Sequence, residues 1–357
     1  MARPQRSLSA AVVAVVALAG LLATGRWLQP RLDHETPVAP PTRPPSTSPT
    51  VVTATHPPNS PGITKTADTA LVDAIAVTPR RVWIAAGGLV MWIDPTAPGK
   101  VGVPGIRTVA PPVVELAAGA GAVWAATTAG RQLLRIDPRT ARITASLSVP
   151  AGAVAADRSA VWAVCCEAGA RRGQLTRIDP ATGRVVKVIG LPGHPYAVGI
   201  GPSGVWVRGE ELLWRIDPTS SRVVATIPLP SSVTFRGDAV HPGEPGGDIA
   251  VTEDAVWVSD PAAATVWRID PRHNQVDGTR WEADGSDLAV AADGVVWATS
   301  DTRLLGLGGP EVRGPRRNLH ELNTDRITAV AAAGDGGLWL GTPQGLFHLD
   351  QSVLREG

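Results

Sequence analysis

The chain has 357 residues, more than the roughly 250 to 300 that one compact core usually serves, so we expect several domains or an array of repeats. Its 38 glycines, 33 prolines and 18% charged residues disfavour coiled coils and helical bundles, and its 44% hydrophobic content disfavours disorder throughout. The formal net charge of +1 disfavours a nucleic-acid-binding protein, which would use a strong positive field.

The first 28 residues predict a membrane anchor. Arg3 and Arg6 precede an uncharged, mostly apolar run from Leu8 to Gly25. At ~1.5 Å per residue this run spans about 27 Å, close to the thickness of a bilayer core. The leading arginines favour a cytoplasmic N-terminus. A cleaved secretory signal is the alternative, so the protein is expected to be either a single-pass protein of the cell membrane or secreted, with the rest of the chain outside the cytoplasm.

Residues 29–62 predict a linker. They are rich in Pro, Thr and Ser and contain three Pro-Pro pairs. Such a segment cannot bury a core and favours extended polyproline II geometry. We therefore expect a disordered, semi-rigid connection between the anchor and a domain at residues 63–357.

That domain is built from a repeat. A tryptophan after a hydrophobic residue recurs seven times, at intervals of 38 to 51 residues. In most copies a small-residue apolar run precedes it, an Ile-Asp-Pro motif follows it, and a β-branched run comes last. Each copy therefore predicts four short strands separated by turns, as in a β-propeller blade. The tryptophans are Trp83, Trp124, Trp162, Trp206, Trp257, Trp297 and Trp339.

The parts of the repeat suit a closed ring of blades. Each tryptophan would fill the wedge between two blades and bury roughly 150 to 250 Å². In the Asp-Pro turns, proline presets φ and the aspartate side chain can accept hydrogen bonds from the following backbone N–H groups. The seventh copy lacks an outer strand, so we expect Ile63 to Ala67 to supply it and close the ring. A structural role in turns is predicted for Asp94, Asp137, Asp179, Asp217 and Asp270.

These motifs resemble the virginiamycin B lyase, or streptogramin lyase, type of seven-bladed propeller over residues 63–350. The resemblance implies an all-β fold of seven four-stranded blades. Lyases of that family open a cyclic depsipeptide by magnesium-assisted elimination with histidine and glutamate, and their blades commonly read Trp-Phe-Thr-Glu. The blades here read WIAA, WAAT, WAVC, WVRG, WVSD, WATS and WLGT. That glutamate is absent from all seven, so no catalytic residue carries over by motif.

The antiparallel strand order assigns the connections to two faces. Those that enter the first strand of a blade, and those that join its second and third strands, share one side, the loop face. The Asp-Pro turns lie on the other side, the turn face. Two long connections belong to the loop face, Cys165–Gln174 and Ser231–Gly247, and long loops on a rigid scaffold commonly carry binding groups. The predicted binding residues are Arg171, Arg172, Phe235, Arg236, His241 and Glu244.

Three carboxylates are predicted to meet at the channel mouth. Aligning the copies on tryptophan places Glu115, Asp248 and Asp287 at equivalent starts of inner strands on the loop face. Together they could bind a hard cation such as Mg²⁺ or Ca²⁺, although solvated or arginine-paired carboxylates are the alternative. His194 and His241 are weak catalytic candidates, since either could act as a general base beside a carboxylate, and solvated surface histidines are the alternative.

The spacing of the cysteines does not indicate a zinc site. Cys165 and Cys166 are adjacent, and no Cys/His spacing suggests a zinc site. We expect two thiols in preference to a vicinal disulfide, because its eight-membered ring would strain the intervening peptide.

The leading hypothesis is a membrane-tethered, extracytoplasmic propeller that binds a small molecule, peptide or protein on its loop face. A metal-assisted, streptogramin-lyase-like C–O lyase or hydrolase at the channel mouth is the second. A structural scaffold that uses the blade rims is the third.

Overall fold

The computed structural model describes residues 52–56, 62–69, 71–97, 101–102, 112–127, 132–166, 172–230, 247–283, 287–308, 318–322 and 326–355. The chain divides into two units, residues 1–48 and 49–357, and every described residue belongs to the second. The expected membrane segment and most of the expected linker therefore lie outside the described residues. Within the described ranges, no helix has the length and apolar character needed to cross a membrane.

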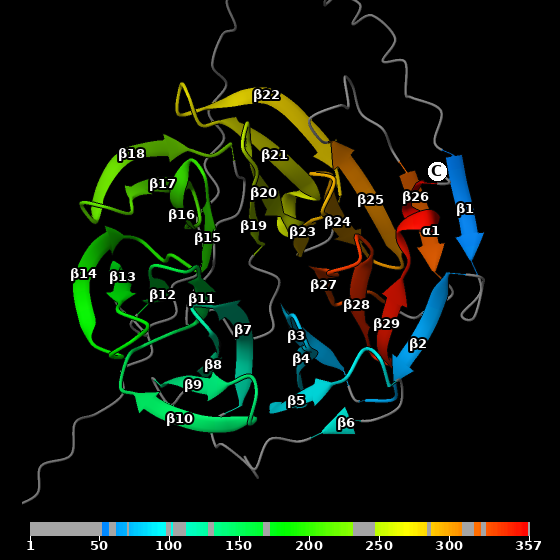
Figure 1. The fold of residues 1–357 in the computed structure, drawn as a ribbon. Helices are drawn as coiled ribbons and strands as arrows, with labels where there is room; N and C mark the ends of the chain where they lie inside the picture. Colours follow the sequence, from blue (N-terminus) through cyan, green and yellow to red (C-terminus); the bar gives the residue numbers. More distant parts are fainter. Residues whose placement is uncertain are drawn as a thin grey trace, which may run out of the picture. The chain divides into compact units, whose positions relative to one another are not determined.

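The strands form seven sheets around a central axis, as the repeat predicts (Figure 1). The first strand of each blade contacts the first strands of both neighbouring blades, so these strands complete an inner ring. Blade 1 consists of β3 (Val72–Thr78), β4 (Arg81–Ala86), β5 (Leu89–Ile93) and β6 (Val101–Gly102). Blade 2 consists of β7 (Val113–Gly119), β8 (Ala122–Thr127), β9 (Leu133–Asp137) and β10 (Arg142–Leu147). Blade 3 consists of β11 (Ala153–Ala156), β12 (Val161–Cys166), β13 (Arg172–Ile178) and β14 (Val185–Pro192). Blade 4 consists of β15 (Ala197–Gly201), β16 (Gly204–Arg208), β17 (Leu212–Asp217) and β18 (Arg222–Pro228).

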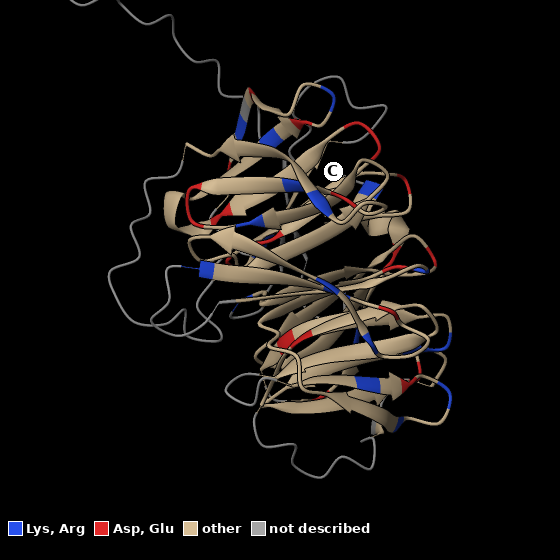
Figure 2. Cartoon of the chain, turned by 90° about the vertical axis from the view of Figure 1, so that its left-hand side faces the viewer, with Lys and Arg blue, Asp and Glu red and all other residues tan. Residues whose placement is uncertain are grey.

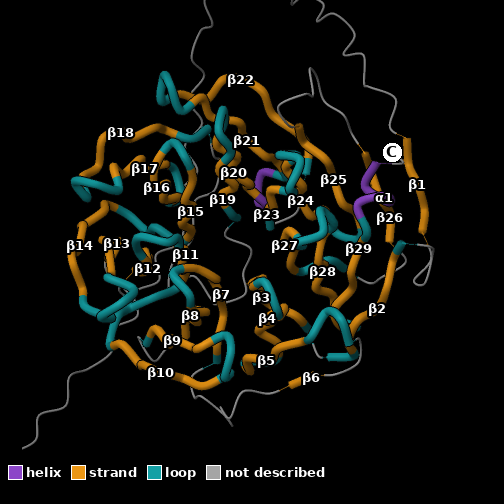
Figure 3. The backbone as a smooth tube through the Cα atoms, in the orientation of Figure 1, coloured by secondary structure: helices purple, strands orange, loops and turns teal. Residues whose placement is uncertain are grey.

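The last three blades complete the ring. Blade 5 consists of β19 (Ile249–Val251), β20 (Val256–Asp260), β21 (Thr265–Asp270) and β22 (Gln275–Glu282). Blade 6 consists of β23 (Leu288–Val290), β24 (Val296–Ser300), β25 (Arg303–Gly308), β26 (Asn318–Leu322) and β1 (Val52–His56), and blade 7 of β27 (Ala329–Ala332), β28 (Leu338–Thr342), β29 (Gly345–Leu349) and β2 (Ile63–Ala67). Helix in the described part is confined to the short elements η1 (Pro261–Ala263) and α1 (Gln351–Arg355), drawn purple in Figure 3.

The hydrophobic core is divided among the seven junctions between blades. Each of the seven apolar clusters takes its buried side chains from two adjacent blades. The repeated tryptophan lies in the cluster between its own blade and the next, and all seven are at most 5% exposed. The wedge-filling role predicted for these tryptophans is therefore confirmed.

In blades 2 to 5, an arginine on the third strand covers the repeated tryptophan. The strand register places Arg135 opposite Trp124, for example, and the same pairing recurs in blades 3, 4 and 5. The guanidinium groups lie 5.4 to 5.9 Å from the ring centroids, within the range of a cation–π interaction. Some of these arginines also bond to the turn of the next blade: Arg215 Nη1 donates to Pro271 O over 2.7 Å. In blades 3 and 4 the arginine of the repeat thus links one blade to its neighbour.

The Asp-Pro turns have the structure that was predicted for them. In each of the five, one aspartate oxygen accepts a hydrogen bond from the backbone N–H two residues later, over 2.7 to 2.9 Å. These backbone hydrogen bonds lower the pKa of Asp137, Asp179 and Asp217, and for Asp270 the His273 side chain contributes most. The turn aspartates are therefore structural, as expected.

The ring closes as the sequence predicts. Ile63–Ala67 forms β2, which pairs antiparallel with β29 as the outer strand of blade 7. A strand that was not expected, β1, pairs in parallel with β26 on the outer edge of blade 6. It lies within the segment that composition assigns to the linker.

Charged residues of both signs are interspersed over the strands and turns in Figure 2.

We expect Ile63→Ala to weaken the fold markedly. Ile63 is 4% exposed and packs in the core between blades 6 and 7. An isoleucine-to-alanine change in a packed core costs about 2 to 5 kcal/mol of unfolding free energy. Urea unfolding followed by tryptophan fluorescence measures this loss. The control is Val186→Ala on β14, where the side chain is 55% exposed and the change should stay within about 0.5 kcal/mol. Equal losses in the two variants would contradict the closing role of β2.

Candidate functional site

The three predicted carboxyl residues occupy equivalent positions at the loop-face ends of inner strands. Glu115 pairs with Ala126, the second residue after its blade's tryptophan. Asp248 and Asp287 face the corresponding residues, Ser259 and Thr299, whose backbone N–H groups donate to the aspartate carbonyls over 3.1 Å. The alignment of the repeats on tryptophan therefore placed these residues correctly. Each side chain is partly exposed.

The two aspartates connect adjacent blades through backbone hydrogen bonds. Asp248 Oδ1 accepts from Ile249 N over 2.7 Å, and Asp248 Oδ2 accepts from Leu288 N, at the start of the next inner strand, over 3.2 Å. Asp287 repeats this arrangement one blade further on, since its Oδ2 accepts from Val330 N over 2.7 Å. The two side chains therefore span blades 5, 6 and 7 near the ring axis.

All three carboxyl groups are held toward their protonated forms. Burial raises the pKa of Glu115 to about 8, and the negative charge of Asp248 adds to the shift. Burial also raises the pKa of Asp287 well above its ordinary value, and the charges of Asp248 and Glu115 act in the same direction. Burial raises the pKa of Asp248 as well, although the hydrogen bond from Asp287 opposes the shift. The pair therefore retains protons to a higher pH than two separate aspartates would.

A buried ion pair flanks the carboxyl groups. The Arg208 and Asp260 side chains are each 2% exposed, and Arg208 Nη2 lies 3.3 Å from Asp260 Oδ2. The guanidinium carbon of Arg208 is also 5.3 Å from the Tyr196 ring centroid, and its positive charge lowers the pKa of Asp248 against the larger effect of burial. The Arg208 side chain thus connects the ends of blades 4 and 5 on the loop face.

Gly247 explains how the chain approaches Asp248 beside this ion pair. Its φ is +80°, a backbone conformation that strongly favours glycine. A Cβ atom at this position would lie 2.1 Å from Ser259 O and 2.4 Å from Arg208 Nη1. Only glycine allows the backbone to pass this close to the guanidinium and to place Asp248 next to the inner strand.

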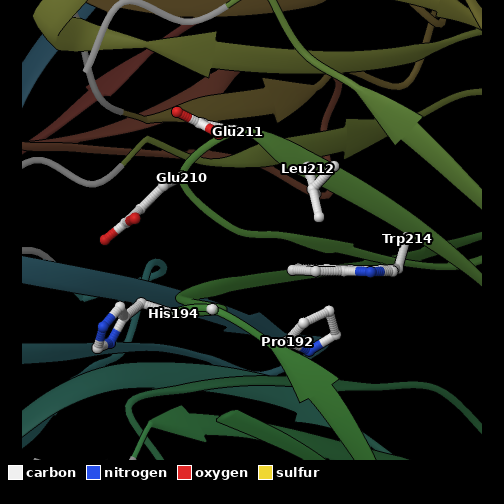
Figure 4. A pocket seen from close by; sticks show the side chains of 7 residues that line it. Pro192, His194, Glu210, Glu211, Leu212 and Trp214 are labelled. Carbon is white, nitrogen blue, oxygen red and sulfur yellow. The ribbon is translucent and has the colours of Figure 1, made fainter. Parts of the chain in front are cut away.

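His194 lies at a separate place on the loop face. With Glu210 it lines a small pocket of ≈ 110 Å³ in blade 4, whose other lining residues include Pro192, Leu212 and Trp214. Figure 4 shows His194 and Glu210 at one end of this pocket and the apolar residues at the other. The pocket joins a titratable pair to an apolar wall, and its lining does not include the three carboxyl residues at the axis.

The other predicted residues fall partly outside the described ranges. Arg172 is exposed, but it begins strand β13 and pairs with Pro192. Because Cys165 pairs with Gln174 across β12 and β13, the connection predicted at Cys165–Gln174 is shorter than expected. Cys165 is partly buried near the end of β12. Residues outside the described ranges are Arg171, Phe235, Arg236, His241 and Glu244.

Arg208 and Asp260 were missed because the sequence interpretation concentrated on inner-strand residues and long loops. A signal was present after the tryptophans. Most blades continue with small or apolar residues there, whereas blade 4 reads WVRG and blade 5 reads WVSD. A charged residue in an otherwise small-residue strand end indicates a buried pair, and opposite charges in neighbouring blades could have identified it.

Comparison with known proteins identifies the fold. No protein-family model and no curated protein matches the sequence. Virginiamycin B lyase from Staphylococcus aureus superposes with a TM-score of 0.63 and 16% identity, over 81% of this chain and 98% of the lyase. The WD40 propeller domain of Doa1 gives 0.62 and 10%, over 82% and 99%. The extracellular domain of a putative one-component system from B. thetaiotaomicron gives 0.56 and 15%, over 82% and 40%. The chain is a seven-bladed propeller that is structurally similar to virginiamycin B lyase at low identity.

The raised pKa of Glu115 predicts a pH-dependent contribution to stability. Because folding raises the pKa of Glu115 from 4.5 to about 8, the unfolded state loses this proton at a lower pH than the folded state does. The resulting loss of stability is absent below pH 4.5 and grows up to about pH 8. Glu115→Gln should therefore gain stability relative to the parent protein between pH 5 and pH 8. Urea unfolding at several pH values measures the difference, with Glu253→Gln as a control for removing an exposed charge. A constant difference over this range would contradict the assignment.

Proposed function

We propose that this propeller is a binding module that accepts a cationic group of its ligand at the channel mouth on the loop face. The observation that carries the proposal is the convergence of Glu115, Asp248 and Asp287, three acidic side chains from three blades. β-Propellers often serve as binding modules, and concave sites with a few convergent polar groups are common ligand sites. The rigid inner strands hold these carboxyl groups in place before a ligand arrives.

The electrostatics of the site select the charge of the ligand. Each carboxyl group has a raised pKa because burial disfavours ionisation, and neighbouring negative charge adds to the shift at Glu115 and Asp287. A positive charge beside them reverses that effect and allows them to lose their protons. An anionic ligand would instead meet the acidic groups with repulsion. The ligand's cationic group is either a divalent metal ion, which prefers oxygen ligands, or an organic ammonium group.

We further propose that the N-terminal segment presents this module outside the cytoplasm. The apolar run from Leu8 to Gly25, preceded by Arg3 and Arg6, has the length and flanking charge of a membrane anchor. The proline-rich residues that follow would hold the ring away from the bilayer. The loop face would then be open to a small molecule, a peptide or another protein.

A second function is supported by one specific observation. The pKa of Glu115, about 8, suits a group that exchanges protons near neutral pH. A general acid or base at the channel mouth would fit a metal-assisted lyase or hydrolase. The solved structures that resemble this chain include virginiamycin B lyase, but at 16% identity the likeness concerns the fold.

We expect cation binding at the channel mouth to release protons. Titration calorimetry of the full chain with Mg²⁺, Ca²⁺ or methylammonium, in buffers of different ionisation enthalpy, measures the protons released per cation. Asp287→Asn should reduce this signal, because the amide keeps a hydrogen-bond donor toward Asp248 but has no carboxyl proton to release. Asp293→Asn, in an exposed turn on the opposite face, should leave it unchanged.

The separate titrants distinguish a metal site from an ammonium site. A signal with Mg²⁺ or Ca²⁺ alone identifies a metal ion as the cation, and a signal with methylammonium alone identifies an amine. If none of the three releases protons, or if Asp287→Asn behaves as the parent does, the proposed site is wrong.

A further inference from the structure

Blade 7 departs from the repeat at the residue that covers its tryptophan. In blades 2 to 5 an arginine stands opposite the tryptophan, whereas in blade 7 the register pairs Trp339 with His348. The imidazole lies 4.5 Å from the Trp339 ring, centroid to centroid. A guanidinium has no lone pair to offer a metal ion, but an imidazole does. The substitution therefore introduces a possible metal ligand at this one position of the ring.

Two carboxylates flank the His348 ring. Asp335, in the turn between β27 and β28, places Oδ2 3.0 Å from Nε2, and Asp350, just after β29, places Oδ1 3.2 Å from Nδ1. The three residues offer ligand atoms that all lie within 4.8 Å of one another. Asp335 and Asp350 are 57% and 54% exposed, so water and ions can reach the cluster from the turn face.

His348 Nε2 and Asp335 Oδ2 are spaced like two ligand atoms of one metal ion. Nε2 is buried and makes no hydrogen bond within the described part of the chain, although Asp335 Oδ2 is only 3.0 Å away. The two atoms are close but are not aligned as donor and acceptor. Ligand atoms about 2.0 to 2.2 Å from a tetrahedral zinc ion lie about 3.3 Å apart, which is near this spacing.

Asp350 supplies the remaining part of a metal site. A histidine that binds a metal through one nitrogen usually donates its other ring N–H to a carboxylate, which fixes the tautomer and the ring orientation. Asp350 Oδ1 is placed to accept from Nδ1–H, which leaves Nε2 with its lone pair beside Asp335. The mixed nitrogen and oxygen donors suit zinc or a similar transition-metal ion better than magnesium or calcium.

We propose that Asp335 and His348, with Asp350 orienting the imidazole, form a transition-metal site on the turn face of blade 7. His348 Nε2 and the Asp335 carboxylate bind the ion, and water completes its coordination. His348 also pairs with Thr64 of the closing strand β2. Because an ion bound here favours the folded state, it stabilises the blade that closes the ring.

The test is a zinc titration of the full chain in competition with a chromophoric indicator, supported by the visible absorption of bound Co²⁺. We expect one stoichiometric site and a melting temperature that rises with Zn²⁺ concentration. Asp350→Asn should weaken binding about 10- to 100-fold, as the loss of an orienting partner does. Asp335→Asn and His348→Gln remove ligands and should weaken it at least as much. Asp335→Asn changes an exposed side chain, so it reports on binding even if His348→Gln fails to fold.

Two controls separate this site from other candidates. His273→Gln removes an exposed histidine whose Nδ1 lies 2.5 Å from Asp270 Oδ2, in the turn that follows β21, and it should retain zinc binding. Asp287→Asn changes the channel mouth on the opposite face and should retain it as well, so failure of one site is distinguishable from failure of the other. The proposal is overturned if the parent protein has no stoichiometric site, or if both Asp335→Asn and His348→Gln bind zinc as the parent does.

Discussion

The stacking of a third-strand arginine on a second-strand tryptophan is the contact that organises the regular blades. The indole fills the widening gap between two blades, and the guanidinium covers its face while keeping its donors free. In blades 3 and 4 those donors reach the turn of the next blade, from Arg177 Nη1 to Ser221 Oγ over 2.9 Å and from Arg215 Nη1 to Pro271 O over 2.7 Å. In these two blades the arginine thus connects the tryptophan inside the ring to the turn of the next blade, whereas Arg135 and Arg268 bond within their own blades.

This arrangement separates two populations of carboxyl groups. On the turn face, aspartates such as Asp137 accept backbone hydrogen bonds, so their charged form is stabilised and their pKa is lowered. On the loop face, Glu115 and Asp287 are half-buried beside other acidic groups, so the loss of solvation and the neighbouring negative charge raise their pKa. The same chemical group therefore has a lowered pKa on one face and a raised pKa on the other, and the raised values are the basis of the proton-linked binding proposed for the loop face. The difference arises from burial and neighbouring charge, since both populations accept backbone hydrogen bonds.

The features that could be predicted from the sequence are those that the ring repeats. Each wedge requires a large side chain, so seven tryptophans predicted seven blades, and alignment on them placed Asp248 and Asp287 at matching strand starts. Features made by single residues gave no such signal. The strand β1 pairs with β26, more than two hundred residues away, and its short β-branched sequence stands among prolines. The Asp335–His348–Asp350 cluster likewise occurs once, so periodicity could not reveal it. The Arg208–Asp260 pair was visible only as a departure from the small residues that follow the other tryptophans.

Blade 7 shows why departures from the repeat concentrate where the ring closes. Its outer strand comes from the other end of the domain, so no peptide connects β29 to β2, and the junction depends on packing. The apolar side chains of Ile63, Val353 and Leu354 supply that packing in the core shared with blade 6. The equivalent position holds Trp92 in blade 1 and Gly306 in blade 6, so a closed blade does not require an arginine there. The position is then open to a residue such as His348, whose lone pair and flanking carboxylates offer chemistry that a guanidinium cannot provide.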